Sequence, residues 1–173
     1  MRAIWLVSVR LFGASPTQAA RQGAKVLTAR WMPSPLGPLL AIADDERICL
    51  LEFVDRRAIE AQVRTLRRHV AGVVIPGNNK VLERLADALD GYFSGRSLAL
   101  DVPIRVAGTP FQQQVWDELR RIPAGQTCSY AALARRIGRT TAVRAVARAN
   151  GDNRLALLIP CHRVIRATGA LTG

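Results

Sequence analysis

Lysine is almost absent from this sequence, and histidine and cysteine are rare. Of 25 basic residues only Lys25 and Lys80 are lysines, and the chain holds two histidines and three cysteines. The cysteines, at positions 49, 128 and 161, are odd in number and far apart, so they make a poor disulfide framework. Their spacing does not fit a zinc site when only two histidines are available. We therefore expect a reducing cytosol and no bound metal.

Long apolar runs are also lacking. No run approaches the roughly 18 residues that a membrane span requires, so we expect no membrane partner. The N-terminal stretch "MRAIWLVSV" is short and is interrupted at once by Arg10, which argues against a secretion signal. We assign residues 1–30 to a loosely ordered N-terminal arm. The remaining length allows one ordinary domain or two small ones.

Positive charge is abundant and unevenly placed. The net charge is +12, and residues 109–173 supply +7 of it, with ten basic and three acidic side chains. Such a surface favours a polyanion such as nucleic acid. The large excess of arginine over lysine also fits a bias in genome composition, so charge alone does not decide the partner.

Residues 31–106 read as a small α/β domain with a scaffold role. The stretch "GPLLAIADDERICLLEFV" predicts a hairpin, because two apolar runs flank the polar turn "DDER". Apolar residues at helical spacing predict two helices, in "DRRAIEAQVRTLRRHV" and "NNKVLERLADALDGYFSG". Between them "GVVIPG" is a short strand or a loop, and "LALDVPIRV" (residues 98–106) predicts a final strand.

Residues 107–173 read as a mainly helical domain. Thr109, Pro110 and Gln112 form a capping box that opens a helix. Two short helices follow: Ser129 caps "YAALARRI", and Thr141 caps "AVRAVARAN" after a glycine-containing turn. Helix, short turn and helix are typical of a helix-turn-helix that binds DNA.

The second of these short helices has two different faces. Val143, Val146 and Ala147 are predicted to point inward, whereas Arg144 and Arg148, four residues apart, share another face. Ala142, Ala145 and Ala149 keep the rest of the surface small. Such a helix can lie close to a nucleic-acid backbone, although a basic, solvated helix has the same pattern.

The segment "IPCHRVI" places Cys161 beside His162, after a turn at residues 150–153 and the buried strand or core run "LALLI". Two interpretations stay open from the residues alone. Cysteine is among the most often buried residues, so Cys161 fits a structural role. Its basic neighbours also favour the thiolate, and hence a nucleophile. Side chains of adjacent extended residues diverge, so His162 would reach Cys161 more easily through a water.

Three stretches together resemble the O6-alkylguanine-DNA alkyltransferases, also called methylated-DNA–protein-cysteine methyltransferases: "TPFQQQVWDELRRIPAGQTCSYAALARRIG", "AVRAVA" and "IPCHRVIRATGALTG". The resemblance covers residues 109–173 closely and the upstream domain more loosely. It implies a ribonuclease-H-like fold upstream, then a winged-helix-like domain with a helix-turn-helix. It implies direct repair, in which an alkyl group moves from guanine O6, or less readily thymine O4, to Cys161, which is not regenerated.

The resemblance also implies the partners. They are double-stranded DNA containing O6-alkylguanine, bound through the minor groove, and no organic cofactor. We expect a cytoplasmic monomer that is associated with the nucleoid when bound to DNA. The target oxygen lies inside the base stack, so the nucleotide must first be turned out.

The resemblance assigns four residues to the pocket. Cys161 is the alkyl acceptor, and His162 is the base that draws off the thiol proton through a water. Asn153 organises the pocket, and the backbone carbonyl of Val164 reads the guanine edge.

It assigns five more residues to the DNA surface. Arg144 enters the stack in place of the flipped base, and Tyr130 presses on the backbone at that nucleotide's phosphate. Ala145 and Ala147 are the small residues of the helix in the groove. Arg148 departs from the family, which usually has a small residue there; it contacts a phosphate or points to solvent.

Family members continue beyond the position of Gly173 with a Gly-Tyr-Arg-Trp-Gly-like loop and a final helix, which carry a glutamate that holds the active-site histidine. From this difference we expect weak repair, or binding to alkylated DNA without turnover. Two other functions fit parts of the sequence. Non-enzymatic damage-binding relatives carry another residue, often Trp, in place of Cys161, and a transcription regulator would use the helix-turn-helix alone.

Overall fold

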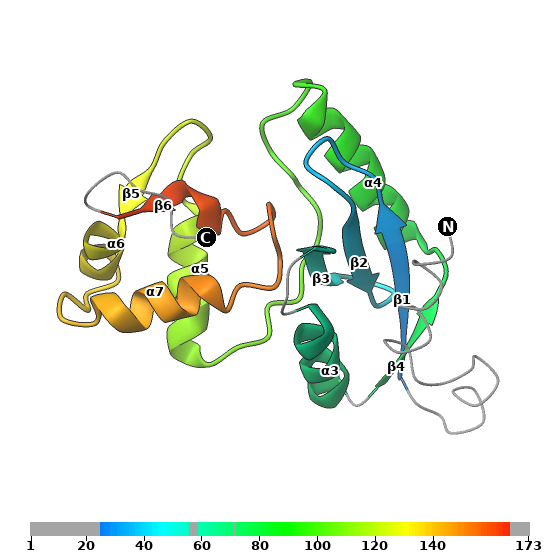
Figure 1. The fold of residues 1–173 in the computed structure, drawn as a ribbon, viewed down its shortest axis with the longest axis horizontal. Helices are drawn as coiled ribbons and strands as arrows, with labels where there is room; N and C mark the ends of the chain where they lie inside the picture. Colours follow the sequence, from blue (N-terminus) through cyan, green and yellow to red (C-terminus); the bar gives the residue numbers. More distant parts are fainter. Residues whose placement is uncertain (1–24, 56–58, 71, 167–173) are drawn as a thin grey trace. The chain divides into compact units, whose positions relative to one another are not determined.

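The computed structural model describes residues 25–55, 59–70 and 72–166 (Figure 1). The chain divides into two compact units between Arg105 and Val106. Within the described residues, no helix is long and apolar enough to cross a membrane.

Unit 1 is built on a four-stranded sheet in the order β3-β2-β1-β4. Its strands are β1 (Lys25–Met32), β2 (Leu39–Ala43), β3 (Ile48–Phe53) and β4 (Gly72–Pro76). Neighbours β3, β2 and β1 pair antiparallel, and β4 runs parallel to β1. The predicted hairpin is confirmed as β2 and β3. All five residues of β2 are buried, as expected for a central strand covered on both faces.

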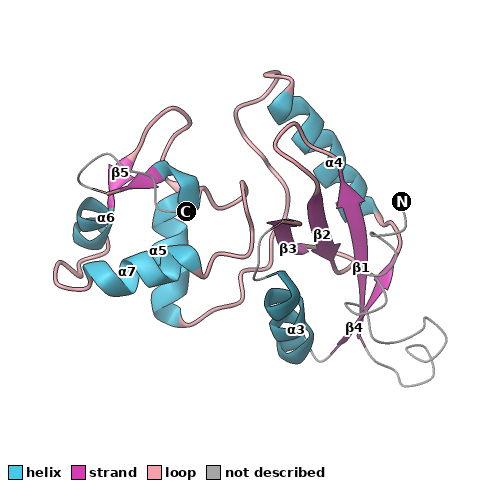
Figure 2. Cartoon of the chain, in the orientation of Figure 1, coloured by secondary structure: helices cyan, strands magenta, loops and turns pink. Residues whose placement is uncertain are grey.

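Two helices pack on this sheet, as the helical spacing predicted (Figure 2). They are α3 (Ile59–Val70) and α4 (Lys80–Phe93). The buried row of α3, which includes Val63 and Leu66, shares a core with Leu40 and Ile42 of β2. Asn79 caps α4, since its side-chain oxygen accepts a hydrogen bond from the backbone N–H of Leu82 at 2.9 Å.

Two details of unit 1 differ from the sequence prediction. Strand β1 begins at Lys25, so residues 25–30, which we assigned to the N-terminal arm, belong to the sheet; residues 1–24 lie outside the described part of the chain. Residues 98–106 do not form a strand but make a single bridge between Ile104 and Ile48. Pro103 explains this, because it has no backbone N–H and only its carbonyl oxygen can bond Ile48.

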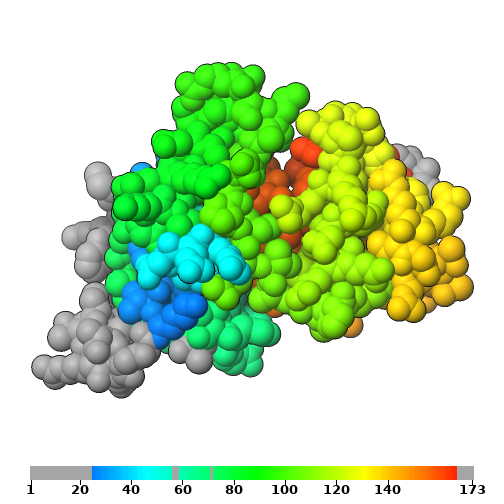
Figure 3. Space-filling model, turned by 180° about the vertical axis from the view of Figure 1, so that it is seen from behind, coloured from blue at the N-terminus to red at the C-terminus, as the bar shows by residue number. Residues whose placement is uncertain are grey.

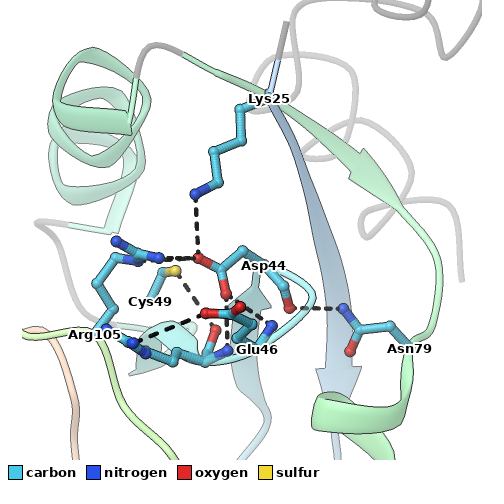
Figure 4. A network of polar contacts seen from close by, with 7 residues as sticks. Lys25, Asp44, Glu46, Cys49, Asn79 and Arg105 are labelled. Carbon is cyan, nitrogen blue, oxygen red and sulfur yellow. Dashed lines mark hydrogen bonds and ion pairs between the residues drawn. The ribbon is translucent and has the colours of Figure 1, made fainter.

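The end of unit 1 is held by a buried carboxylate (Figure 4). Asp44 follows β2, and its side chain is only 5% exposed. Arg105 donates to Asp44 Oδ2 from Nε at 2.9 Å and from Nη2 at 2.6 Å, and Lys25 lies 3.6 Å away. The backbone N–H groups of Glu46 and Arg47 donate to Asp44 Oδ1. One carboxylate thus joins the β2–β3 turn to the last residue of the unit.

Unit 2 is mainly helical. Its elements are α5 (Pro110–Arg120), β5 (Cys128–Ser129), α6 (Tyr130–Arg136), α7 (Val143–Gly151), the 3-10 turn η1 (Cys161–Arg163) and β6 (Val164–Ile165). The helices α5, α6 and α7 pack against one another. The predicted capping box of α5 is confirmed, with Thr109 and Gln112 bonding each other's backbone N–H. Ser129 caps α6, also as predicted.

Two predictions in unit 2 were wrong in detail. The residue before α7 is Ala142, whose side chain makes no capping bond, so Thr141 is not its N-cap. Helix α7 continues through Gly151, so the predicted turn at 150–153 starts inside the helix. "LALLI", predicted as a buried strand or a core run, is a core run: four of its five residues are buried, and its middle residues form turns. Leu157, at φ 68°, breaks the extended path.

Candidate active site

Cys161 begins the short turn η1 directly after the buried Pro160. The backbone N–H of Cys161 donates to the carbonyl oxygen of Ile159 at 2.8 Å, and that of Arg163 donates to Pro160 at 3.0 Å. These bonds close two consecutive tight turns around the thiol. Cys161 is half-buried, so the fold holds this residue without enclosing it completely.

Two contacts anchor the C-terminal end of this turn. The guanidinium of Arg163 donates from Nη1 to the carbonyl oxygen of Ile122, just after α5, at 2.6 Å. Val164 pairs with Cys128 in the short parallel sheet of β5 and β6, and its side chain is 2% exposed. The side chain of Val164 is therefore part of the core, as its predicted role, which uses only the backbone carbonyl, permits.

Asn153 anchors the chain just before the Cys161 turn. Its Nδ2 donates to the carbonyl oxygen of Ile159 at 2.9 Å, and its Oδ1 accepts from the backbone N–H of Leu155 at 3.0 Å. The residue is 1% exposed. Between these two contacts Leu157 adopts a left-handed conformation, which costs an L-residue about 1–2 kcal/mol. The loop before Cys161 is therefore shaped by a buried amide and carries a strained residue.

His162 is an exposed residue next to Cys161. Partial burial of the ring lowers the pKa of His162 below its usual value, and the positive charge of Arg163 acts in the same direction. The imidazole is therefore neutral at pH 7, the form that accepts a proton. Its predicted water-mediated approach to Cys161 stays a prediction.

The other two cysteines differ from Cys161. Cys49 and Cys128 are both buried. Burial raises the pKa of the Cys49 thiol, and it does the same to Cys128. Both are therefore held as neutral thiols, the unreactive form. No group of three or more histidine, cysteine or acidic residues in the described ranges could hold a metal ion.

The candidate DNA surface lies on α6 and α7. Arg144, Ala145 and Arg148 are exposed, and Ala147 is half-buried. The inward face of α7 is formed by Val146, Ala149 and Asn150, whereas Val143 is only half-buried. Figure 3 shows residues 126–150, in yellow to orange, at the surface of unit 2. Small and basic side chains thus share the outward face, while Ala149 is turned inward.

The turn between these helices is closed by a glycine. Gly138 has φ 69°, a conformation that favours glycine. Its N–H donates to the carbonyl of Arg135 at 3.0 Å, and the N–H of Arg139 donates to Ala134 at 2.8 Å. This pair of bonds is a Schellman motif, which ends α6 and fixes the direction in which the chain leaves it.

Helix α7 is also pinned to α5. The indole Nε1 of Trp116 donates to the carbonyl oxygen of Ala149 at 2.8 Å inside the core. At the helix end, Gln112 Nε2 donates to Asp152 Oδ2 at 2.9 Å. Asp152, the acid closest in sequence to the candidate site, is thereby engaged with the first turn of α5.

Sequence reasoning missed Asn150, which lies between two predicted site residues. Its Nδ2 is 3.5 Å from Tyr130 Oη and 3.5 Å from the carbonyl oxygen of Cys161. The sequence does hold one sign that Asn150 lies in the core. Asn150 follows Val146 by four positions, so it continues the inward row of α7, where a polar residue is unusual.

Both units match descriptions of one protein family. Residues 28–106 match "6-O-methylguanine DNA methyltransferase, ribonuclease-like domain", and residues 110–173 match "6-O-methylguanine DNA methyltransferase, DNA binding domain". A methylated-DNA–protein-cysteine methyltransferase of Salmonella typhimurium is 39% identical over 143 residues, which cover 81% of this chain and 82% of that protein. One of Mycobacterium bovis is 40% identical over 144 residues, covering 83% and 81%.

A solved structure is similar as well. The Mycobacterium tuberculosis protein OGT, in complex with DNA, superposes with a TM-score of 0.71 at 36% identity. The match covers 86% of this chain and 83% of that one. The likeness therefore extends over both units and is not confined to the segment around Cys161.

Proposed function

This chain belongs to the family of 6-O-methylguanine DNA methyltransferases, and we propose on that basis that it repairs O6-alkylguanine in DNA by direct reversal, with Cys161 as the alkyl acceptor. The choice of Cys161 as the acceptor rests on a difference in burial between the three cysteines. Cys161 is the half-exposed cysteine of the three, whereas the other two are buried with raised pKa values. An acceptor that must meet a base in DNA has to be accessible.

The proposed step is one displacement. The sulfur of Cys161 attacks the alkyl carbon, and the S–C bond forms as the bond from that carbon to guanine O6 breaks. The electron pair of the broken bond stays on the base, which takes up one proton and becomes ordinary guanine. The proton lost by the thiol balances this uptake. Because the thioether is stable, each molecule reacts once.

His162 is proposed to move that proton. Its lowered pKa keeps it neutral near pH 7, so it can accept the proton from the thiol, directly or through a water. Arg163, beside it, disfavours the protonated imidazole, and therefore favours passing the proton on to the base that leaves. No cofactor takes part in this balance.

Helices α6 and α7 are proposed to form a helix-turn-helix in a winged-helix-like unit that docks in the minor groove. The Schellman turn at Gly138 and the packing of both helices on α5 support this geometry. The exposed Arg144 and Arg148, with Ala145 between them and Ala147 beside them, provide a small, basic face. On this face Arg144 would fill the space of the flipped base, and Tyr130 would contact its phosphate.

The pocket is proposed to close around the flipped base from the turn at Cys161. Asn153 would keep that turn in place, which its two buried hydrogen bonds support. The backbone carbonyl of Val164 would accept a hydrogen bond from the guanine edge. Both roles depend on backbone geometry, so both are sensitive to how η1 is anchored.

One experiment tests the proposal directly. The chain is incubated with duplex DNA containing O6-methylguanine, and intact and peptide masses are measured. We expect one methyl group per molecule, on Cys161, and an equal amount of restored guanine. Cys161→Ala should still bind the duplex but take up no methyl group. Binding without any mass increment in the parent chain would overturn the proposal in favour of a damage-binding protein.

A further inference from the structure

Asn150 is buried where two parts of the candidate site meet. It lies in the last turn of α7 and is 8% exposed. Its Nδ2 faces the hydroxyl oxygen of Tyr130, from the start of α6, and the carbonyl oxygen of Cys161, from η1. An amide nitrogen carries two hydrogens, so it can serve both acceptors at once. One side chain thus spans the proposed phosphate contact and the proposed nucleophile.

The bonds that Asn150 makes in the free protein are weak. Both distances are 3.5 Å, beyond the usual range of about 2.7–3.2 Å for such bonds. Its Oδ1 is buried and has no hydrogen-bond partner within the described residues. A buried acceptor without a donor lowers stability, whereas an apolar side chain of similar size would not. The neighbouring inward positions Val146 and Ala149 are apolar.

A polar residue at this position is therefore poorly explained by the stability of the free fold. Hydrogen bonds in active sites are often long before substrate binds and shorten in the complex. In the proposed complex Tyr130 contacts a phosphate, and that contact would fix its hydroxyl oxygen as a partner for the amide of Asn150. Tyr130 Oη accepts the bond from Nδ2 through a lone pair, so this contact does not use the hydroxyl hydrogen.

We infer that Asn150 is a positioning residue for alkyl transfer, which couples the DNA-backbone contact of Tyr130 to the turn that carries Cys161. This inference rests on the proposed function. With DNA bound, the amide holds Tyr130 and the Cys161 carbonyl together, so the sulfur is presented to the alkyl carbon in line with the bond that breaks. Misplacement of a reacting group by about 1 Å costs roughly a hundredfold in rate, so a modest loosening of η1 is measurable.

The test compares N150L, which keeps the number and branching of the side-chain heavy atoms and removes both N–H donors, with the parent chain. Three quantities are measured: the free energy of unfolding, the Kd for a duplex containing O6-methylguanine, and the single-turnover rate of methyl transfer at saturating DNA. We expect N150L to be at least as stable as the parent. Its Kd should stay within about threefold, while its transfer rate falls about tenfold or more.

A merely structural role gives another result. Stability and transfer rate would then fall together, and so would DNA binding, and that outcome overturns the inference. If N150L does not fold, N150A, which cannot overpack the site, is measured in the same way. Q114L is the matched control, since Gln114 Nε2 also donates to a backbone carbonyl, that of Ile137 at 3.2 Å, but away from Tyr130 and Cys161. Its transfer rate should equal that of the parent.

A double-mutant cycle with Y130F checks the coupling. If Asn150 acts through Tyr130, the two rate losses are not additive, and the double variant is little slower than the slower single one. If the two rate losses are additive, Asn150 does not act through Tyr130. A parent chain that transfers no methyl group refutes the proposed function itself, whereas a parent that transfers normally beside an equally active N150L refutes only this inference.

Discussion

Asn153 Nδ2 donates a hydrogen bond of 2.9 Å to the carbonyl oxygen of Ile159, across the loop that separates α7 from the thiol. The same carbonyl accepts the backbone N–H of Cys161 at 2.8 Å. One oxygen thus receives both the amide that closes the loop and the first N–H of the nucleophile turn. The orientation of Cys161 is consequently set by a residue eight positions earlier in the chain.

Replacing Asn153 by Ala should destabilise unit 2 by about 2–4 kcal/mol. The change leaves the N–H of Leu155 and one lone pair of Ile159 without their partner in a buried site. Urea unfolding monitored by tryptophan fluorescence measures the loss. N78A is the control, because Asn78 makes exposed contacts, and it should cost less than about 0.5 kcal/mol. Equal effects of the two variants would contradict the importance of this amide.

Two glycine substitutions should have opposite signs. Gly138→Ala places a side chain at φ 69° and should destabilise by about 1–2 kcal/mol. Gly91→Ala lies inside α4, where an added Cβ meets nothing within 4 Å, and should stabilise by up to about 1 kcal/mol. Thermal unfolding of both variants checks the pair. A stabilised G138A would contradict the left-handed turn between α6 and α7.

Asp44 should make unit 1 sensitive to acid. Burial raises the pKa of Asp44, but the backbone N–H groups of Glu46 and Arg47 and the guanidinium of Arg105 outweigh burial and leave the pKa below its usual value. Above the unfolded pKa of about 3.9 the stabilisation is complete, and it is lost as the pH falls through the lower native pKa.

Asp44→Asn should therefore cost about 2 kcal/mol or more at pH 7, and the difference from the parent should shrink toward pH 2. Urea unfolding at a series of pH values measures it. D45N, which changes an exposed acid in the same turn, should track the parent throughout. A difference that does not depend on pH would exclude a charge effect.

Thiol reagents should distinguish the cysteines without any DNA. At pH 7.5 iodoacetamide should modify Cys161 at least about tenfold faster than Cys49 or Cys128, because burial keeps the last two protonated and covered. Peptide mass spectrometry over time gives the three rates. In C161A the fast phase should be absent. Rapid modification of Cys128 would mean that β5 opens readily.

Alkyl transfer should weaken in acid only below about pH 6.5, the ordinary pKa of histidine. Burial and Arg163 both lower the pKa of His162, so the neutral base persists to a lower pH than in a free imidazole. Single-turnover rates from pH 5 to 8 measure the acidic limb. R163M should shift that limb to higher pH, whereas R163K, which keeps the charge, should leave it in place. If the acidic limb of R163M stays in place, Arg163 does not lower the pKa of His162.

Local patterns predicted most of the elements. The capping residues Thr109 and Ser129 and the helical rows of α3 and α4 depend on neighbours a few positions away, and all were found as expected. Strand β1 was not predicted because residues 1–30 were assigned to the N-terminal arm; its parallel partner β4 lies more than 40 positions later, where a local pattern does not show the pairing. The strand expected at 98–106 had the right apolar residues but lacks a partner beyond Ile48.

For the candidate site too, some residues were predicted from local patterns and one was missed. Cys161 and His162 were singled out by their types and by a family motif, and the exposure of Arg144 follows from helical spacing. Asn150 was predicted as the last residue of its helix and the first residue of the turn at 150–153, whereas the helix continues through Gly151. Its contacts reach Tyr130, 20 positions earlier, and Cys161, 11 positions later, and such distances are not visible in a sequence pattern.

The parallel pair of β5 and β6 has a consequence for the order of folding (Figure 1). Cys128 meets Val164 only after 36 positions of chain have been closed into a loop (164 − 128 = 36), and each strand has two residues. Loop closure of this length opposes pairing, and so short a ladder adds little in return, so we expect it to form after the three helices have packed. We then expect the anchoring of the Cys161 turn through β6 to be completed last. Because each molecule reacts once, the methyl groups accepted by a population would count only those chains that have finished folding.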